Sequence, residues 1–356
     1  MASANSTQKP LLKWPGGKYR EYSKFQQYLP ASFDRYVEPF AGGAGVFFAH
    51  APQGRVLLND LCTDLIEFYQ AVKTGLYAQD FVRVAGMWTA LTDYARDIHD
   101  LFGGFYRTDE AIPHQYFIPC PALAWEMELL PYVYATVSDK IRRIKKIEAE
   151  KGICFTSAEL FDHTETAVRT AFYNYFRAIA NGEQASEIPR TVAWVFVREF
   201  CYSSMFRTGP KGCNVPYGGI SYNSKNIAEK IQQINSAHVA DLFASAEFTN
   251  LDFERFFHTV DPGAGDFLFL DPPYDSPFSA YDDNAFNRAD HTRLAALLAT
   301  TPAKWMMVIS WTEFIGGLYD EMLGVNAEFF DKKYSANMRN RGNQEAVHVI
   351  YRNYQN

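Results

Sequence analysis

Short apolar runs alternate with helical patterns in the first part of the chain. Residues 36–48 have the pattern of a buried strand, a glycine-rich turn and the start of a helix. Residues 55–60 form a second apolar run that ends in Asp60, and residues 64–73 repeat apolar positions at helical spacing. Strands that alternate with helices are typical of a parallel sheet with crossover helices, so we predict a doubly wound, Rossmann-like α/β fold.

Apolar runs return near the other end of the chain. They have the length of buried strands and lie at residues 266–271, 305–310 and 346–351. The first of them ends in Asp271. We expect this acid at the carboxyl edge of the sheet, where open α/β folds bind their ligands.

The sequence between these two groups of strands has a different pattern. Residues 140–147 and 166–177 place apolar side chains at helical spacing, and strand-like runs are few. Turn residues between 209 and 219 flank short segments and predict a β-hairpin. We therefore predict a mostly helical insertion that carries this hairpin. The predicted domains are residues 1–80 together with 241–356 for the sheet, and residues 81–240 for the insertion.

Composition and charge narrow the class of protein. The chain has 356 residues, of which 47% are hydrophobic and 21% charged, so general disorder is excluded. The net charge of −7 argues against a protein that binds polyanions over its whole surface. A local basic surface is still indicated, because residues 201–228 contain three basic residues and no acid. Aromatic residues make up 16% of the chain, which suits either packing or stacking on flat ligands.

Several features indicate where the protein works and what it does not contain. No apolar stretch approaches the ~20 residues needed to cross a bilayer, and the first residues lack the pattern of a secretory signal. The five cysteines are odd in number and form no CxxC pair, and the eight histidines show no HxxxH spacing. We expect a cytoplasmic protein with no membrane segment, disulfide framework or metal site.

The glycine-rich turn is a candidate binding site. Glycines after a strand let a ligand approach the backbone, and the helix behind them favours a negative group. No Lys-Ser or Lys-Thr pair follows, so a triphosphate loop is not indicated. Asp60 closes the second strand and suits ribose hydroxyls, but the G-x-G-x-x-G spacing of dinucleotide sites is missing. A nucleoside without phosphate fits better, and S-adenosyl-L-methionine is the leading candidate.

The strongest chemical signal is the tetrapeptide Asp271-Pro272-Pro273-Tyr274 directly after an apolar strand. The two prolines end the strand and fix an extended backbone. A carboxylate, a rigid carbonyl and an aromatic face are then presented together, which suits a planar base that carries an amino group. If Asp271 and the Pro272 carbonyl accept both hydrogens of that amine, its lone pair becomes available to attack a methyl sulfonium. Tyr274 would stack on the base.

These motifs resemble the Dam-like adenine-specific DNA methyltransferases of the DPPY type. Residues 12–18, LKWPGGK, resemble the N-terminal cofactor motif of that family, and Glu38-Pro39-Phe40 with the glycines resembles its glycine motif. Residues 250–253 resemble the motif at the end of its third strand. The resemblance implies that the cofactor-binding residues are Trp14, Lys18, Glu38, Pro39, Phe40, Gly42, Gly43, Gly45, Asp60, Asp252 and Phe253.

The resemblance extends to DNA contacts. Residues 213–218, CNVPYG, resemble the end of the family's DNA-contacting hairpin, and the basic segments 140–151, 201–228 and 332–341 are expected to face phosphates. The implied DNA-binding residues are Arg207, Lys211, Asn214, Pro216, Tyr217, Arg339 and Arg341. The segment between Arg207 and Asn214 is shorter than in the Dam proteins that read GATC, and the insertion is larger, so the recognition sequence stays open.

The resemblance implies a site-specific methyl transfer from S-adenosyl-L-methionine to the 6-amino group of an adenine flipped out of double-stranded DNA, which leaves S-adenosyl-L-homocysteine. Neither a metal nor a covalent enzyme intermediate is implied. We expect a monomer, and a cognate restriction or defence protein is a partner that the sequence leaves open. Three alternatives also stay open: methylation of the cytosine amino group, an RNA substrate, and a DNA-binding relative without catalysis.

Overall fold

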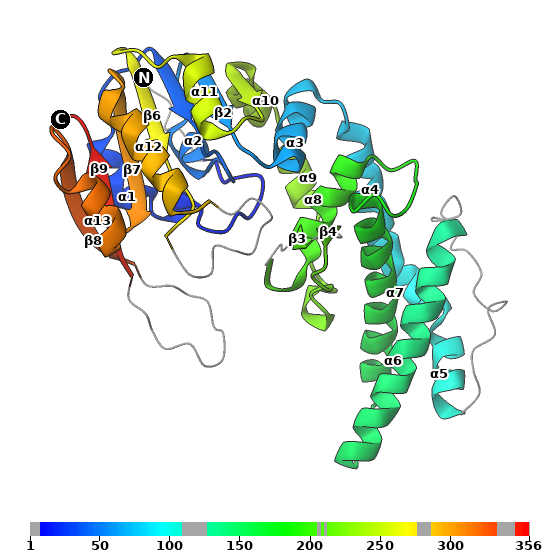
Figure 1. Ribbon diagram of the computed structural model, residues 1–356. Coiled ribbons are helices and arrows are strands. Elements are labelled where there is room, and N and C mark those ends of the chain that lie inside the picture. The colour runs from blue at the N-terminus through cyan, green and yellow to red at the C-terminus, as the bar shows by residue number, and fades with distance from the viewer. Residues whose placement is uncertain are drawn as a thin grey trace. The chain divides into compact units, whose positions relative to one another are not determined.

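The computed structural model describes residues 8–108, 127–204, 208–209, 212–275, 286–332 and 346–355. The chain forms two compact units (Figure 1). Unit 1 comprises Met1–Thr74 and Ala237–Asn356, and unit 2 comprises Gly75–Ser236. The insertion predicted at residues 81–240 covers most of unit 2.

Unit 1 contains a seven-stranded sheet with the order β5-β2-β1-β6-β7-β9-β8. The strands are β1 (Arg35–Glu38), β2 (Arg55–Asn59), β5 (Ala246–Thr249), β6 (Asp266–Leu270), β7 (Lys304–Ser310), β8 (Asn326–Lys332) and β9 (Ala346–Arg352). Strands β5, β2, β1, β6 and β7 are parallel, whereas β9 runs antiparallel to both β7 and β8. The sheet confirms the predicted α/β fold class, and β8 is a strand that the sequence pattern did not predict.

Helices cover both faces of the sheet because successive strand side chains point to opposite sides and both sides are apolar. Val37 and Leu268 lie in a core shared with α11 (Phe253–Val260), α12 (Arg288–Thr300) and α13 (Glu313–Tyr319). On the other face, the Tyr36 ring packs against Phe33 and against His50 at the end of α2 (Gly45–His50). The remaining described helices of unit 1 are η1 (Lys18–Arg20), α1 (Tyr22–Phe25), η2 (Gln26–Tyr28), α3 (Thr63–Thr74) and α10 (Ala237–Ala244).

Unit 2 is mostly helical. Its elements are α4 (Ala78–Asp97), α5 (His99–Arg107), η5 (Met127–Leu129), α6 (Leu130–Lys151), α7 (Ser157–Ala180), α8 (Arg190–Phe200), η6 (Tyr202–Ser204), β3 (Thr208–Gly209), β4 (Gly212–Cys213), η7 (Ile220–Tyr222) and α9 (Ala228–Ile234). Strands β3 and β4 pair antiparallel and form the predicted hairpin, which is short. Helix α7 begins with a capping box in which Thr156 and Glu159 satisfy each other's backbone N–H groups.

The core of unit 2 accounts for much of the aromatic excess. The Trp88 ring lies 4.2 Å from the Phe200 ring, and Phe172 stacks on Phe176 at 4.4 Å between ring centres. Arg169 on α7 joins this core to α4, because its guanidinium lies 4.2 Å from the Trp88 ring and donates to the Trp88 carbonyl at 3.0 Å. These rings therefore contribute packing area rather than exposed stacking surface.

In the part of the chain that the structure describes, no helix combines the length and the apolar character of a membrane span. Within the same ranges, no three His, Cys, Asp or Glu side chains gather as they would around a metal ion.

Candidate functional site

The carboxyl ends of the parallel strands bring the predicted motifs to one edge of the sheet. The glycine turn follows β1, Asp60 follows β2, Asp252 follows β5, and Asp271 follows β6. Because these strands are neighbours and run in the same direction, segments far apart in the sequence meet at this edge. The edge is therefore the candidate site.

The glycines of the turn are required by the N-terminal segment of the chain itself. A Cβ atom on Gly42, whose φ is +47°, would lie 2.9 Å from Trp14 Cδ1, and a Cβ on Gly43 would lie 2.8 Å from Trp14 Cβ. A Cβ on Gly45 would lie 2.8 Å from the backbone nitrogen of Tyr19. The glycines of this turn were predicted to let a ligand approach the backbone closely. The structure adds that Trp14 does so as well.

Asp60 holds the turn in place. One of its carboxylate oxygens accepts a hydrogen bond from the backbone N–H of Gly42 at 2.8 Å, and the other accepts from that of Cys62 at 2.8 Å. The Gly42 carbonyl in turn accepts from the Tyr69 hydroxyl at 2.8 Å. Asp60 therefore ties the end of β2 to the turn that follows β1, and the predicted contact with a ribose stays a prediction.

Glu38 lies beneath the turn with only 2% of its surface exposed. One carboxyl oxygen accepts from the Tyr36 hydroxyl at 2.6 Å and from the Phe47 backbone N–H at 3.0 Å. Burial raises the pKa of Glu38 to about 8, and the negative charge of Asp271 acts in the same direction. At neutral pH this acid is therefore mostly protonated. Sequence reasoning placed Glu38 among the cofactor contacts, whereas the contacts seen here are with its own chain.

Asn59 is a supporting residue to which sequence reasoning gave no role. It is buried, and its amide donates to the carbonyls of Pro39 and Leu251 at 3.0 and 2.9 Å. Its oxygen accepts from the Leu251 N–H at 3.0 Å and from the Thr249 hydroxyl at 2.9 Å. One side chain thus joins the ends of β1, β2 and β5. The available signal was a polar residue that closes an apolar run.

Lys18 meets the tetrapeptide. Its side chain is 1% exposed, and its ammonium forms an ion pair with Asp271. The same ammonium donates to the Tyr274 hydroxyl at 2.7 Å and to the Gly16 carbonyl at 3.1 Å, and it lies 4.8 Å from the centre of the Tyr274 ring. A buried ammonium needs such a partner because desolvation is costly. Lys18 was predicted to pack near the cofactor, and the structure places it on Asp271 and Tyr274.

Tyr274 is also held from the side of β9. The ring of His348, which is fully buried, meets the Tyr274 ring edge-on with 5.5 Å between centres. His348 Nδ1 lies 3.4 Å from a carboxylate oxygen of Glu21, which directly follows η1. Tyr274 is thus bounded by the N-terminal segment and by β9. Sequence reasoning missed Glu21 and His348, because nothing local connects them with residue 274.

Three phenylalanines form a cluster at the same edge. The rings of Phe40, Phe253 and Phe286 lie 5.4 to 5.6 Å apart. Asp252 caps α11 by accepting from the Glu254 N–H at 3.0 Å. These contacts bring Phe40 and Phe253 together beside Asp252, and the Phe253 ring is buried among its neighbours, so the cofactor contacts of these residues stay a prediction.

The hairpin residues of unit 2 divide into exposed and buried ones. Asn214 and Pro216 are exposed. Tyr217 is buried, and its hydroxyl lies 3.2 Å from the Asn223 side-chain oxygen. Tyr202, which sequence reasoning missed, is 53% exposed beside the hairpin, and its N–H donates to the Pro216 carbonyl at 2.8 Å. The four predicted DNA-binding residues Arg207, Lys211, Arg339 and Arg341 lie outside the described residues.

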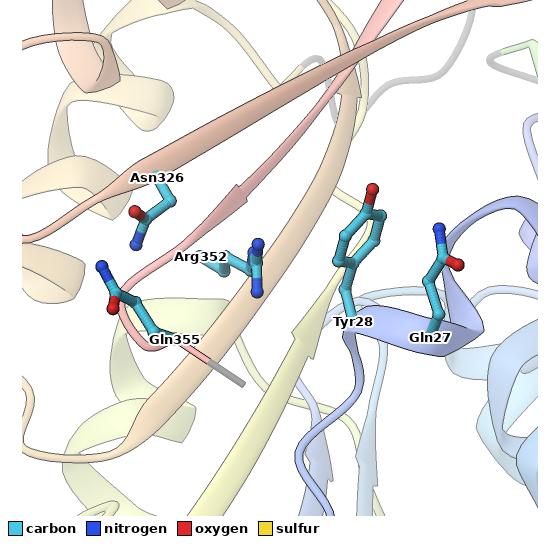
Figure 2. A pocket seen from close by; sticks show the side chains of 5 residues that line it. All are labelled: Gln27, Tyr28, Asn326, Arg352 and Gln355. Atoms are coloured by element: carbon cyan, nitrogen blue, oxygen red, sulfur yellow. The ribbon is translucent and has the colours of Figure 1, made fainter.

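A polar hollow of about 520 Å³ lies at the opposite, amino-terminal edge of the sheet (Figure 2). Its lining residues are Gln27, Tyr28, Asn326, Arg352 and Gln355. The hollow contains none of the predicted site residues, so it is distinct from the site at the strand ends.

The chain is similar in sequence to known DNA methyltransferases. The family model of the D12 class N6 adenine-specific DNA methyltransferases matches residues 14–118 and 128–339. The chain is 26% identical over 352 residues to the Type II methyltransferase M.CviBI of Paramecium bursaria Chlorella virus NC1A, covering 97% of this chain and 100% of that protein.

Two further methyltransferases are similar to the chain. The chain is 26% identical over 330 residues to the Type II methyltransferase M.MjaIII of Methanocaldococcus jannaschii, covering 88% of each chain. It is also 35% identical over 106 residues to a DNA adenine methylase of Vibrio cholerae serotype O1, covering 30% of this chain and 37% of that protein.

Proposed function

Since the chain belongs to the D12 class of N6 adenine-specific DNA methyltransferases, we propose that its methyl donor is S-adenosyl-L-methionine and that Asp271, Pro272 and Tyr274 hold the target base. The reaction is methylation of adenine in DNA. Methylation of the cytosine amino group and a silent DNA-binding relative are not favoured by these similarities.

The observation that carries the proposal is the contact of Lys18 with both Asp271 and Tyr274. The adenine amine is a poor nucleophile because its lone pair is delocalised into the ring. Asp271 and the Pro272 carbonyl accept the two hydrogens of the amine, which frees that lone pair. Lys18 fixes the carboxylate and the phenol relative to each other, so that the base meets groups already in position.

The residues at the strand ends fit S-adenosyl-L-methionine, which supplies an electrophilic methyl group bound to a sulfonium. A carboxylate oxygen can accept more than one hydrogen bond, so Asp60 can serve the glycine turn and the ribose together. Asp252, which is half-buried, follows β5 and directly precedes Phe253, whose ring packs against Phe40. The backbone around Gly42, Gly43 and Gly45, packed by Trp14, forms the floor of this site. Glu38 and Pro39 support that floor from the end of β1.

Unit 2 is proposed to read the DNA. Asn214 and Pro216 are exposed on the hairpin, and Tyr202 beside them presents an aromatic face. Tyr217 contributes by packing, because its ring lies against Trp88 and Tyr173. The residues proposed to contact phosphates are Arg207 and Lys211 of unit 2 and Arg339 and Arg341 of unit 1. Contacts with phosphates would make DNA binding sensitive to salt. The adenine has to leave the base stack to reach Asp271.

The test compares wild type with Asp271→Ala. Purified protein is incubated with DNA and labelled S-adenosyl-L-methionine, and the modified nucleoside is identified after digestion. We expect N6-methyladenine from the wild type, and no methyl transfer from the variant although it still binds the methyl donor. Methylation by the variant at the wild-type rate would exclude Asp271 from the reaction. Sequencing that detects methylated bases, applied to cells expressing the protein, identifies the recognition site.

A further inference from the structure

Asp275, the residue directly after the tetrapeptide, joins three segments of the chain. Its carboxylate receives two hydrogen bonds from the Arg288 guanidinium, from Nε to Oδ1 at 3.0 Å and from Nη2 to Oδ2 at 3.1 Å. The Thr312 hydroxyl donates to Oδ2 at 3.0 Å. Only 13% of the Asp275 side chain is exposed. We call this group of three residues the Asp275 clasp.

The partners of Asp275 are themselves fixed. Arg288 is the first residue of α12, and its guanidinium lies 4.7 Å from the centre of the Phe314 ring. Thr312 caps α13, since its hydroxyl oxygen accepts from the Ile315 N–H at 3.2 Å. The Thr312 hydroxyl thus donates to Asp275 and accepts from the helix. The clasp connects the end of β6 with the starts of two helices that pack on the same face of the sheet.

A buried histidine lies on the same helix as Arg288. His291 on α12 is 1% exposed, and its ring lies 4.7 Å from that of Phe286 and 6.3 Å from that of Phe314. Burial lowers the pKa of His291 to about 4, although the Pro273 carbonyl and the negative charge of Asp275 oppose this shift. The ring is therefore neutral at physiological pH. It packs against the Phe286 and Phe314 rings, and the Phe314 ring also meets the Arg288 guanidinium.

We propose that Asp275 is a positioning residue for methyl transfer, and that it acts by fixing the direction in which the chain leaves Tyr274. Lys18 and His348 hold the Tyr274 side chain, whereas the clasp holds the backbone that follows it. Charge-assisted, two-pronged pairs of this kind restrict geometry more than single hydrogen bonds do. This inference rests on the proposed function, because Tyr274 has to face the adenine for its position to matter.

The test measures single-turnover methylation and the KM values for DNA and for S-adenosyl-L-methionine. The variants are Asp275→Ala, Asp275→Asn, Arg288→Ala and the double variant Asp275→Ala with Arg288→Ala. We expect the two alanine single variants to lower the methylation rate by about 10- to 100-fold, the range that displacement of a reacting group produces. The KM for S-adenosyl-L-methionine should change by less than about twofold, because the glycine turn is not touched.

Two comparisons separate positioning from a general structural role. The double variant should be no slower than the slower single variant, because both changes open one clasp. Asp275→Asn keeps an oxygen that can accept from Thr312, so it should recover part of the rate. Arg288 is 66% exposed, so its alanine variant should fold even if a change at the buried Asp275 does not.

Glu247→Ala is the matched control. Glu247 forms a similar two-pronged pair with Arg55, with distances of 2.8 and 3.3 Å, at the amino-terminal edge of the sheet. Its loss should leave the methylation rate unchanged. The proposal is overturned if folded Arg288→Ala methylates DNA at the wild-type rate, or if Glu247→Ala is slowed as much as Asp275→Ala. An active Asp271→Ala variant would instead overturn the proposed function itself, so the two failures are distinguishable.

Discussion

The buried acid Glu38 should make unit 1 less stable as the pH rises from 6.5 to 8. Its pKa is about 8 in the folded protein, against an ordinary value of 4.5. A folded-state pKa that is raised means that the stabilisation is complete below the unfolded value and is lost as the pH rises through the folded value. Replacement by glutamine, which resembles the protonated acid but does not titrate, should remove this loss.

The size of the effect follows from the width of the pH window. Each unit of pH between the two pKa values costs about 1.4 kcal/mol, so the interval from 6.5 to 8 costs about 2 kcal/mol. Histidines, whose ordinary pKa is about 6.5, still titrate at the start of this window, but all the proteins compared contain the same histidines, so this contribution cancels in the difference between them. For a unit of this length, about 2 kcal/mol corresponds to a fall in Tm of about 4–8 °C.

Differential scanning calorimetry of wild type, Glu38→Gln and Glu247→Gln at pH 6.5 and 8 measures this effect. The Tm of the wild type and that of Glu247→Gln should both decrease between pH 6.5 and 8. Glu247 does not titrate in this pH range, because its pairing with Arg55 lowers its pKa. In Glu38→Gln, most of this decrease in Tm between pH 6.5 and 8 should be absent. Contributions from unit 2 cancel in the difference between proteins. If Glu38→Gln falls as steeply as the wild type, the assignment of a buried, protonated Glu38 is wrong.

Two further substitutions test the packing of each unit. Gly43→Ala should displace Trp14, because a Cβ atom on residue 43 would lie 2.8 Å from Trp14 Cβ. We expect it to weaken binding of the methyl donor by about tenfold in calorimetric titration. Gly317→Ala is the control, because a Cβ atom there has nothing within 4 Å, and equal affinities of the two variants would refute this prediction. Arg169→Met should lower the free energy of unfolding of unit 2 by about 3–5 kcal/mol in chemical denaturation, because Glu165 loses the cation with which it pairs. A decrease of less than about 1 kcal/mol in the free energy of unfolding would contradict this prediction.

The sequence predicted the strands of unit 1 whose two faces are both buried, because such strands appear as continuous apolar runs. The run at 266–271 corresponds to β6 because all its residues in the strand are buried and the prolines after it stop the ladder. Strand β8 escaped prediction for the opposite reason. It is an edge strand, it carries Glu328, Asp331 and Lys332, and Phe329 is 56% exposed. A strand with so little burial leaves no apolar run to detect.

The candidate site was predictable where its chemistry is local. The tetrapeptide and the glycine turn each present their groups within a few residues, and both lie at the carboxyl edge of the sheet. The contacts that position them are not local. Lys18 lies 253 residues from Asp271 in the sequence, and His348 meets Tyr274 from another strand. Such partners follow from the order of the strands and from where the N-terminal segment packs, which hydrophobic patterning does not determine.

The two acids nearest the reaction illustrate why strand order matters. In the sequence, Glu38 and Asp271 are each an acid at the end of an apolar run. In the fold, β1 and β6 are neighbouring parallel strands, and burial together with the negative charge of Asp271 raises the pKa of Glu38. Lys18 pairs with Asp271, whereas burial makes Glu38 bind its proton more tightly. Asp271 thereby keeps an ion pair with Lys18, which suits the hydrogen-bond acceptor role proposed for it, whereas Glu38 becomes a neutral support for the turn. The division of roles comes from Lys18, a residue of the N-terminal segment that belongs to neither strand.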